Sequence, residues 1–284
     1  MNYANCVLCP RMCGVDRAAG AVGFCGCPGE AVVAKTMLHK WEEPALAGSG
    51  GSGAIFFGGC TLGCSYCQNS AISRRPVGTV VDATGLRREM ESLIAQGAEN
   101  IDLVTPTQYL PTVLEALEQP LPVPVVYNCG GYERRETIEK LRGKVDIFLP
   151  DLKYAENDLA LALSGAGNYF ETAMAAIEKM VEITGPVQWQ GERLVKGTVI
   201  RHLILPGHVE NSLKVLDAIG DRFGKRVLVS LMRQYTPMPG MQPPFDRPIT
   251  PEEYDAVLSW MFLNDLNGFT QEDTAASKTY IPDF

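Results

Sequence analysis

Residues 54–69 read AIFFGGCTLGCSYCQN, a short apolar run followed at once by three cysteines spaced C-x3-C-x2-C. The run is typical of a buried strand, and the glycines after it let the backbone turn closely around a bound group. Three thiolates on one short loop can hold three irons of a [4Fe–4S] cluster and leave the fourth iron without a protein ligand. Structural zinc is the alternative, but zinc prefers four ligands, and no further Cys or His lies nearby in the sequence.

Five similar runs follow the first, and each reads as a short buried strand. Repeated strand–helix units predict a parallel sheet with right-handed crossovers. Six units are too few for a closed eight-unit barrel, so we expect an α/β fold, a partial (β/α)6 barrel. The further strands are expected at residues 100–105, 122–128, 145–150, 197–205 and 226–231, and helices at 83–96, 110–117, 133–141, 171–183, 209–223 and 251–267.

Polar side chains follow the predicted strands, where ligands bind in parallel sheets. Thr105, Asn128, Asp151 and Lys153 all stand at such ends. Arg201 lies inside a predicted strand, where alternate side chains point inward, so we expect it to face the bound ligand. Ordinary loop composition is the alternative for the group, and a solvated surface position is the alternative for Lys153.

The other cysteines concentrate near the N-terminus. Cys6, Cys9, Cys13 and Cys25 are spaced C-x2-C-x3-C-x11-C, with Cys27 close behind. So short a segment rarely folds on an apolar core alone, and we expect a metal to hold it together. Zinc, a second iron–sulfur cluster and a rubredoxin-like iron are all compatible, with Cys25 or Cys27 as the fourth ligand. Such a site either stabilises the segment or passes electrons to the first cluster.

These patterns divide the chain into two parts. Residues 1–46 are expected to form a small Cys-rich, metal-binding extension, and residues 47–284 the strand–helix core. Residues 47–53 (AGSGGSG) are predicted to be a flexible linker between them. We expect residues 273–284 to pack at the rim of the barrel. Cys129 is expected to be a small buried side chain rather than a ligand.

Composition limits the class of protein. Nine cysteines are an odd number, which excludes a fully disulfide-paired monomer. The chain shows no signal-peptide pattern and no apolar stretch of 18 residues, so we expect no membrane association and a reducing, cytoplasmic location. A net charge of −8 opposes binding to a phosphate backbone, and no nucleic-acid partner is expected.

The three-cysteine loop resembles the signature of the radical S-adenosylmethionine superfamily, in which C-x3-C-x-aromatic-C follows the first strand. Within that superfamily the chain is similar to the pyruvate formate-lyase activating enzymes, and in particular to a branch related to them. The similarity covers most of the chain, and its loop is far more specific for the superfamily than for a substrate. It rests on residues 6–14 (CVLCPRMCG), 42–44 (EEP), 51–53 (GSG), 56–60 (FFGGC), 64–69 (CSYCQN) and 151–153 (DLK).

This resemblance implies two cofactors, a [4Fe–4S] cluster and S-adenosylmethionine (SAM). Cys60, Cys64 and Cys67 would hold the cluster, whose open iron would chelate SAM. One electron would cleave SAM and give a 5′-deoxyadenosyl radical that abstracts hydrogen from a substrate. The cofactors supply this chemistry, so no catalytic residue is expected beyond the cluster ligands. Asn128 is expected to hydrogen-bond the SAM ribose.

Further SAM contacts follow from the same resemblance. Asp151 and Lys153 match an Asp-Leu-Lys element that lies beside the cofactor in activating enzymes, and a Lys153 cation suits the methionine carboxylate. One departure concerns the amino group of SAM. Residues 105–108 (TPTQ) stand where a Gly-Gly-Glu motif is usual. The group that holds the amino nitrogen therefore differs, and Thr105 and Thr107 are the candidates.

The resemblance also implies a substrate and partners. The substrate would be a glycine residue of a partner glycyl radical enzyme, which makes the protein an oxidoreductase of the activating type. A reductant such as flavodoxin or ferredoxin would supply the electron. One alternative is the same chemistry on a small molecule or another macromolecule. The other is a non-catalytic iron–sulfur electron carrier, for which an open iron would have no use.

Overall fold

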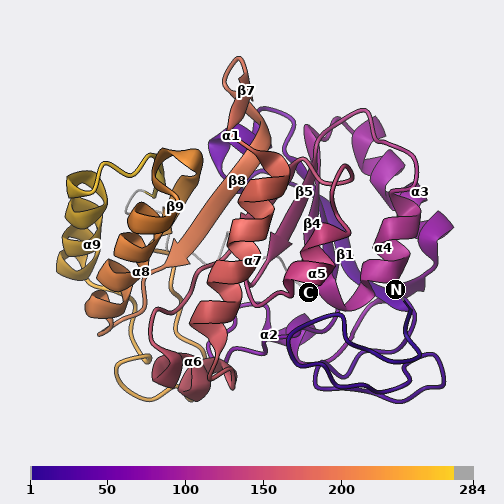
Figure 1. Ribbon diagram of the computed structural model, residues 1–284, viewed down its shortest axis with the longest axis horizontal. Helices are drawn as coiled ribbons and strands as arrows, with labels where there is room; N and C mark the ends of the chain where they lie inside the picture. The colour runs from indigo at the N-terminus through magenta and orange to yellow at the C-terminus, as the bar shows by residue number, and fades with distance from the viewer. Residues whose placement is uncertain (1, 272–284) are drawn as a thin grey trace.

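The computed structural model describes residues 2–271 and shows one large sheet with helices against it (Figure 1). Across those residues ten strands are ordered β10-β9-β8-β6-β5-β4-β2-β1-β3, with β7 paired to β8. The six middle strands pair in parallel, which confirms the predicted α/β fold with its open, partial barrel. They are β2 (Ser52–Phe57), β4 (Asn100–Val104), β5 (Val125–Cys129), β6 (Ile147–Pro150), β8 (Arg193–Leu203) and β9 (Leu228–Met232).

Helices connect the strands, and Figure 1 shows them side by side in front of the sheet. The side chain of Asp82 caps the first long one by accepting from the Gly85 N–H at 2.6 Å. That helix then buries Leu86, Met90 and Leu93, which share one face at helical spacing. The helices are α3 (Ala83–Ala95), α4 (Leu110–Ala116), α5 (Arg135–Glu139), α6 (Asn157–Ser164), α7 (Tyr169–Thr184), α8 (Val209–Arg222) and α9 (Pro251–Leu263).

The two faces of the sheet differ in polarity because side chains alternate along each strand. Leu103 and Tyr127 belong to the main hydrophobic core. Their chain neighbours Asp102 and Asn128 therefore point to the opposite face, and the two side chains meet there at 3.2 Å. Arg201 reaches the same place and donates to Asn128. The concave face of the partial barrel thus carries a group of buried polar side chains.

Several elements escaped the sequence prediction. The strand β1 (Ala31–His39) pairs antiparallel with β2, so the sheet begins inside the segment assigned to the N-terminal extension. Three short edge strands and α6 were also not expected, nor were two one-turn helices. These additional elements are β3 (Thr79–Val81), β7 (Gln188–Gln190), β10 (Gly268–Thr270), α1 (Pro44–Ala47) and α2 (Ser70–Ser73). Residues 273–284, expected at the barrel rim, lie outside the described residues.

The prediction of a flexible linker at residues 47–53 is wrong. Ala47 ends α1 and Ser52 begins β2, and both are buried. A Cβ atom on Gly53 would lie 3.0 Å from the Asn100 carbonyl oxygen of the neighbouring strand. The glycines here permit close approach of two backbones, which composition alone does not distinguish from flexibility.

The N-terminal extension contains no helix or strand within residues 2–30, and it lies below α4 and α5 in Figure 1. A single arginine fixes much of it. Arg17 is 2% exposed and donates to the carbonyl oxygens of Cys27, Pro28 and Gln108. The extension is therefore held to the core by side chain-to-backbone hydrogen bonds. Among the helices that the structure describes, none is long and apolar enough to cross a membrane.

Candidate cofactor site

The three-cysteine loop leaves the end of β2 through two glycines. Gly59 has a φ of +78°, which L-residues with side chains rarely adopt. A Cβ atom there would also lie 2.1 Å from the Sγ of Cys27, which belongs to the N-terminal extension. The Cys27 thiol contacts the carbonyl oxygen of Gly58 at 3.7 Å. The loop therefore depends on glycine because the extension packs directly against its backbone.

Each of the three thiols accepts at least one hydrogen bond. The Leu62 N–H lies 3.4 Å from the Sγ of Cys60. The hydroxyls of Ser164 and Ser73 lie 3.1 Å and 3.4 Å from the Sγ atoms of Cys64 and Cys67, respectively. Burial, together with the neighbouring Cys64 and Cys67 thiols, raises the pKa of Cys60 to about 12. The Cys64 and Cys67 thiols thus lie near the Cys60 thiol.

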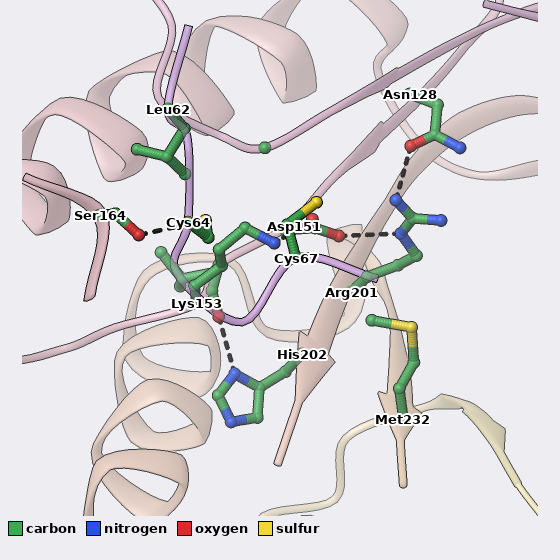
Figure 2. Close-up of polar contacts among 12 residues, drawn as sticks. Leu62, Cys64, Cys67, Asn128, Asp151, Lys153, Ser164, Arg201, His202 and Met232 are labelled. Atoms are coloured by element: carbon green, nitrogen blue, oxygen red, sulfur yellow. Dashed lines mark hydrogen bonds and ion pairs between the residues drawn. The ribbon is translucent and has the colours of Figure 1, made fainter. Parts of the chain in front are cut away.

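A cavity of about 220 Å³ opens beside two of these thiols. Asp151 accepts from the Lys153 ammonium at 2.5 Å and from the Arg201 guanidinium at 2.9 Å, as Figure 2 shows. Burial opposes the ionisation of Asp151, but the two cations outweigh it, and its pKa lies below the usual value. The lining includes Cys64, Cys67, Asn128, Asp151, Lys153 and Arg201. Residues far apart in the sequence, all expected at the site, thus share one cavity.

Asn128 already has partners in this arrangement. Its side-chain oxygen accepts from Arg201 at 2.5 Å, and its nitrogen lies 3.2 Å from an Asp102 oxygen. A hydrogen bond from Asn128 to a ribose, as the sequence predicts, would have to replace or share one of these. Arg201 and Asp102 therefore control how Asn128 is oriented.

The two threonines after β4 have separate surroundings. Thr105 has a φ of +58°, and its carbonyl oxygen accepts from the Gln108 side chain at 2.8 Å. Thr107 begins the one-turn helix η1 (Thr107–Tyr109) and donates to Glu133 at 2.6 Å. The Thr107 hydroxyl is thus directed to a buried carboxyl rather than to the cavity. Thr105 stays a predicted contact for the amino group of SAM. The prediction that Thr107 contacts this group is wrong, because its hydroxyl donates to Glu133.

The profile of the radical SAM superfamily matches residues 54–219, more than half of the chain. The chain belongs to the radical SAM superfamily. The match supports the superfamily, and the activating-enzyme branch stays a prediction.

Individual proteins resemble this radical SAM protein in sequence or in fold. An uncharacterized protein of Methanocaldococcus jannaschii, MJ0674, is 29% identical over 270 residues, covering 90% of this chain and 74% of its own length. A radical SAM methyltransferase from Sphaerobacter thermophilus aligns with a TM-score of 0.57 at 15% identity, over 78% of this chain and 66% of that chain. Streptococcus suis SuiB aligns with a TM-score of 0.53 at 14% identity, over 76% of this chain and 47% of that chain. This chain thus spans between about half and two thirds of those two structures.

A radical SAM protein carries a [4Fe–4S] cluster and SAM, and the donor set of the loop suits that cluster. Within residues 2–271 no three His, Cys, Asp or Glu side chains converge as ligands of one metal ion. Three cysteines on one short loop match the protein ligands of such a cluster, whereas structural zinc takes four ligands. A cation and a buried carboxylate at the same cavity fit a zwitterionic cofactor.

Two acidic side chains near Arg201, those of Glu42 and Asp102, were not predicted as site residues. Glu42 lies 3.7 Å from Arg201 and lines both the first cavity and a second one of about 460 Å³. Burial raises the pKa of Glu42 well above its usual value, and Asp102 and Glu43 add to that effect. Burial likewise raises the pKa of Asp102 to about 7. An aspartate inside an apolar strand was the signal that could have identified Asp102 from the sequence.

The N-terminal cysteines lie in several different environments. Cys6 accepts from Arg17 at 3.6 Å, and Cys13, which is exposed, accepts from a backbone N–H at 3.4 Å. A hydrogen bond from the Cys27 thiol, with help from Arg17, lowers the pKa of Cys25 to about 6. Cys129 is 2% exposed in the core strand β5, as expected of a small buried side chain. In the described part of the chain, the N-terminal set does not converge on a single ion either.

Proposed function

We propose that this protein binds a [4Fe–4S] cluster through Cys60, Cys64 and Cys67 and SAM in the adjoining cavity, and acts as a radical enzyme. When bound, these cofactors supply a 5′-deoxyadenosyl radical that abstracts hydrogen. The observation that carries the proposal is the shared cavity, in which two of the three loop thiols face Lys153 and Arg201. A plain electron carrier would have no need for such a cavity beside its cluster.

The polar residues of the cavity have roles that follow from their charges. Lys153 and Arg201 are held by Asp151 and keep a positive field beside the cysteines. We assign Lys153 to the methionine carboxylate of SAM, because an ammonium on a flexible stem can reach a carboxylate as a point charge. Arg201 is joined to Asn128 and would orient that amide toward the ribose. The buried location of these groups excludes water and strengthens each interaction.

The substrate that we propose is a glycine residue of a glycyl radical enzyme, with flavodoxin or ferredoxin as the electron donor. A protein segment is compatible with the second cavity, which adjoins the first at Glu42 and Arg201. SuiB, which shares the fold, has been solved with a precursor peptide. The alternative substrate is a small molecule, which the same cavity would enclose.

A second metal site in the N-terminal extension belongs to the same proposal. Burial raises the pKa of Cys9 to about 12, and Cys25 and Cys13 lie near enough to Cys9 to add to this effect. Cys27, hydrogen-bonded to Cys25, contacts the cluster loop at Gly59. Metal analysis of reconstituted protein tests this site. About four irons and no zinc per chain would contradict it, whereas more iron or added zinc would support it.

Isotope transfer tests the substrate. Cluster-replete protein, dithionite and SAM would be mixed anaerobically with a glycyl radical enzyme whose glycines carry deuterium. We expect deuterated 5′-deoxyadenosine together with the electron paramagnetic resonance (EPR) signal of a glycyl radical. Formation of undeuterated 5′-deoxyadenosine alone would leave the radical chemistry standing and contradict the glycyl substrate.

A further inference from the structure

The three donors to the loop thiols are not equivalent. Ser164 has the shortest contact, 3.1 Å to the Sγ of Cys64, and it is 3% exposed. The Ser73 hydroxyl and the Leu62 N–H both lie at 3.4 Å from their sulfurs. A thiolate that ligates iron carries negative charge, and a donor to it stabilises the more negative, reduced state of the cluster. The best-placed donor should therefore have the largest effect on the reduction potential.

Ser164 lies next to other buried hydroxyls. Its Oγ lies 2.7 Å from the Oη of Tyr154, and Tyr154 donates to the Oη of Tyr66 at 2.9 Å. A tyrosine hydroxyl has one hydrogen, so the Tyr154 oxygen can only accept from Ser164. An iron-bound thiolate has no hydrogen and also accepts, so Tyr154 and Cys64 compete for the single hydrogen of Ser164, and the charged sulfur forms the stronger bond.

The N-terminal extension holds this donor in place. Figure 2 shows Ser164 beside Cys64, and the serine is the last residue of α6. Arg11 donates to the carbonyl oxygens of Ser164 at 2.9 Å and Gly165 at 2.5 Å. The same guanidinium donates to the Thr61 oxygen at 3.1 Å and to that of Leu62 at 3.3 Å, both in the cluster loop. One arginine thus joins the loop to the end of α6.

We propose that the Ser164 hydroxyl sets the reduction potential of the cluster, and that Arg11 is a positioning residue that holds this donor against Cys64. The inference rests on the proposed function, since it needs the cluster on the loop. It gives the extension a role in tuning the cluster that is independent of any metal at its own cysteines. Tyr154 competes with Cys64 for the Ser164 hydrogen and weakens this effect.

The test is an EPR-monitored redox titration of the reconstituted protein with dithionite and mediators. Ser164→Ala should make one-electron reduction about tenfold less favourable, which is a shift of about 59 mV to lower potential. Ser164→Thr keeps the hydroxyl and should restore the potential. Ser73→Ala should shift it less, and Ser92→Ala, at an exposed position on α3, should leave it unchanged.

Two further variants keep the inference testable if Ser164→Ala assembles no cluster. Tyr154→Phe leaves Ser164 in place and removes the competing acceptor, so it should raise the potential slightly. Arg11→Lys removes the planar fork that joins loop and helix, and it should lower the potential by less than Ser164→Ala does, in both cases at full iron content. Unchanged potentials in cluster-replete Ser164→Ala, or in both of these variants, would overturn the inference. If wild-type protein takes up no cluster at all, the proposed function fails instead.

Discussion

The two groups of cysteines in this protein lie in very different surroundings. The loop after β2 has a glycine turn, hydrogen-bond donors to its thiols and a cavity with Lys153 beside it. The N-terminal cysteines lie in a segment without helix or strand, fixed to the core by Arg17. Cysteine spacing marks both groups as metal candidates. The comparison teaches that cysteine spacing alone does not distinguish a site at the end of a parallel strand, beside a cavity, from one in an irregular segment.

Removing one cysteine from each group tests most directly whether the two groups differ in function. Cys67→Ala should reduce 5′-deoxyadenosine formation below detection, because the cluster loses a ligand. Cys13→Ala removes a proposed ligand of the second site, which does not line the cavity, so the rate with dithionite should stay within about twofold. Product is measured by chromatography after equal cluster loading. Equal loss in both variants would mean that the N-terminal group takes part in catalysis.

The attachment of the extension is tested through its buried arginine. Arg17→Leu leaves the carbonyl oxygens of Cys27 and Gln108 without their donor, and we expect the free energy of unfolding to fall by about 3 kcal/mol. Urea unfolding followed by circular dichroism measures it, with exposed Arg88→Leu as the control. A change no larger than that of the control would show that the hydrogen bonds of Arg17 do not fix the extension.

Two glycines with positive φ test how the extension and the loop meet. Gly59→Ala brings a Cβ atom to 2.1 Å from the Cys27 sulfur, whereas Gly20→Ala, at φ +87°, meets nothing within 4 Å. Both variants carry the left-handed backbone cost of about 1–2 kcal/mol. Overpacking should add about 1 kcal/mol or more at Gly59 alone. Similar unfolding free energies for the two variants would argue against tight contact between Cys27 and the loop.

Cofactor binding gives the smallest expected effect. Lys153→Ala should weaken SAM binding about tenfold, the loss expected for one hydrogen bond to a charged group. Equilibrium dialysis of cluster-replete protein measures the dissociation constant, and Lys140→Ala, exposed after α5, is the control. Equal affinity in the two variants would remove Lys153 from the SAM site and leave Arg201 as the cation that serves it.

Much of the core was predictable because each middle strand is a short apolar run bounded by turn residues. The strand β1 was missed because its sequence, AVVAKTMLH, lies next to the cysteine-rich segment and was assigned with it. The glycines of residues 47–53 read as flexible, although Gly53 is glycine because Asn100 passes so close. Close backbone packing and disorder select the same residue type, so composition cannot separate them.

The candidate site was likewise predictable only in part from the sequence. Asn128, Asp151, Lys153 and Arg201 could be found because strand ends and strand alternation place them on one rim. Thr107 was misjudged because η1 turns its hydroxyl toward Glu133. The Ser164 donor and the Arg11 clamp had no local motif, since they contact residues 100 and 154 positions away in the chain. Such contacts exist only once the tertiary fold brings distant segments together.

Reductive SAM cleavage tests the central claim most directly. Cluster-replete protein would be incubated anaerobically with dithionite and SAM, and 5′-deoxyadenosine and methionine would be quantified beside Cys64→Ala. We predict that wild-type protein forms both products in equal amounts and that the variant forms neither. No 5′-deoxyadenosine from cluster-replete wild-type protein, or equal amounts from Cys64→Ala, would contradict the account.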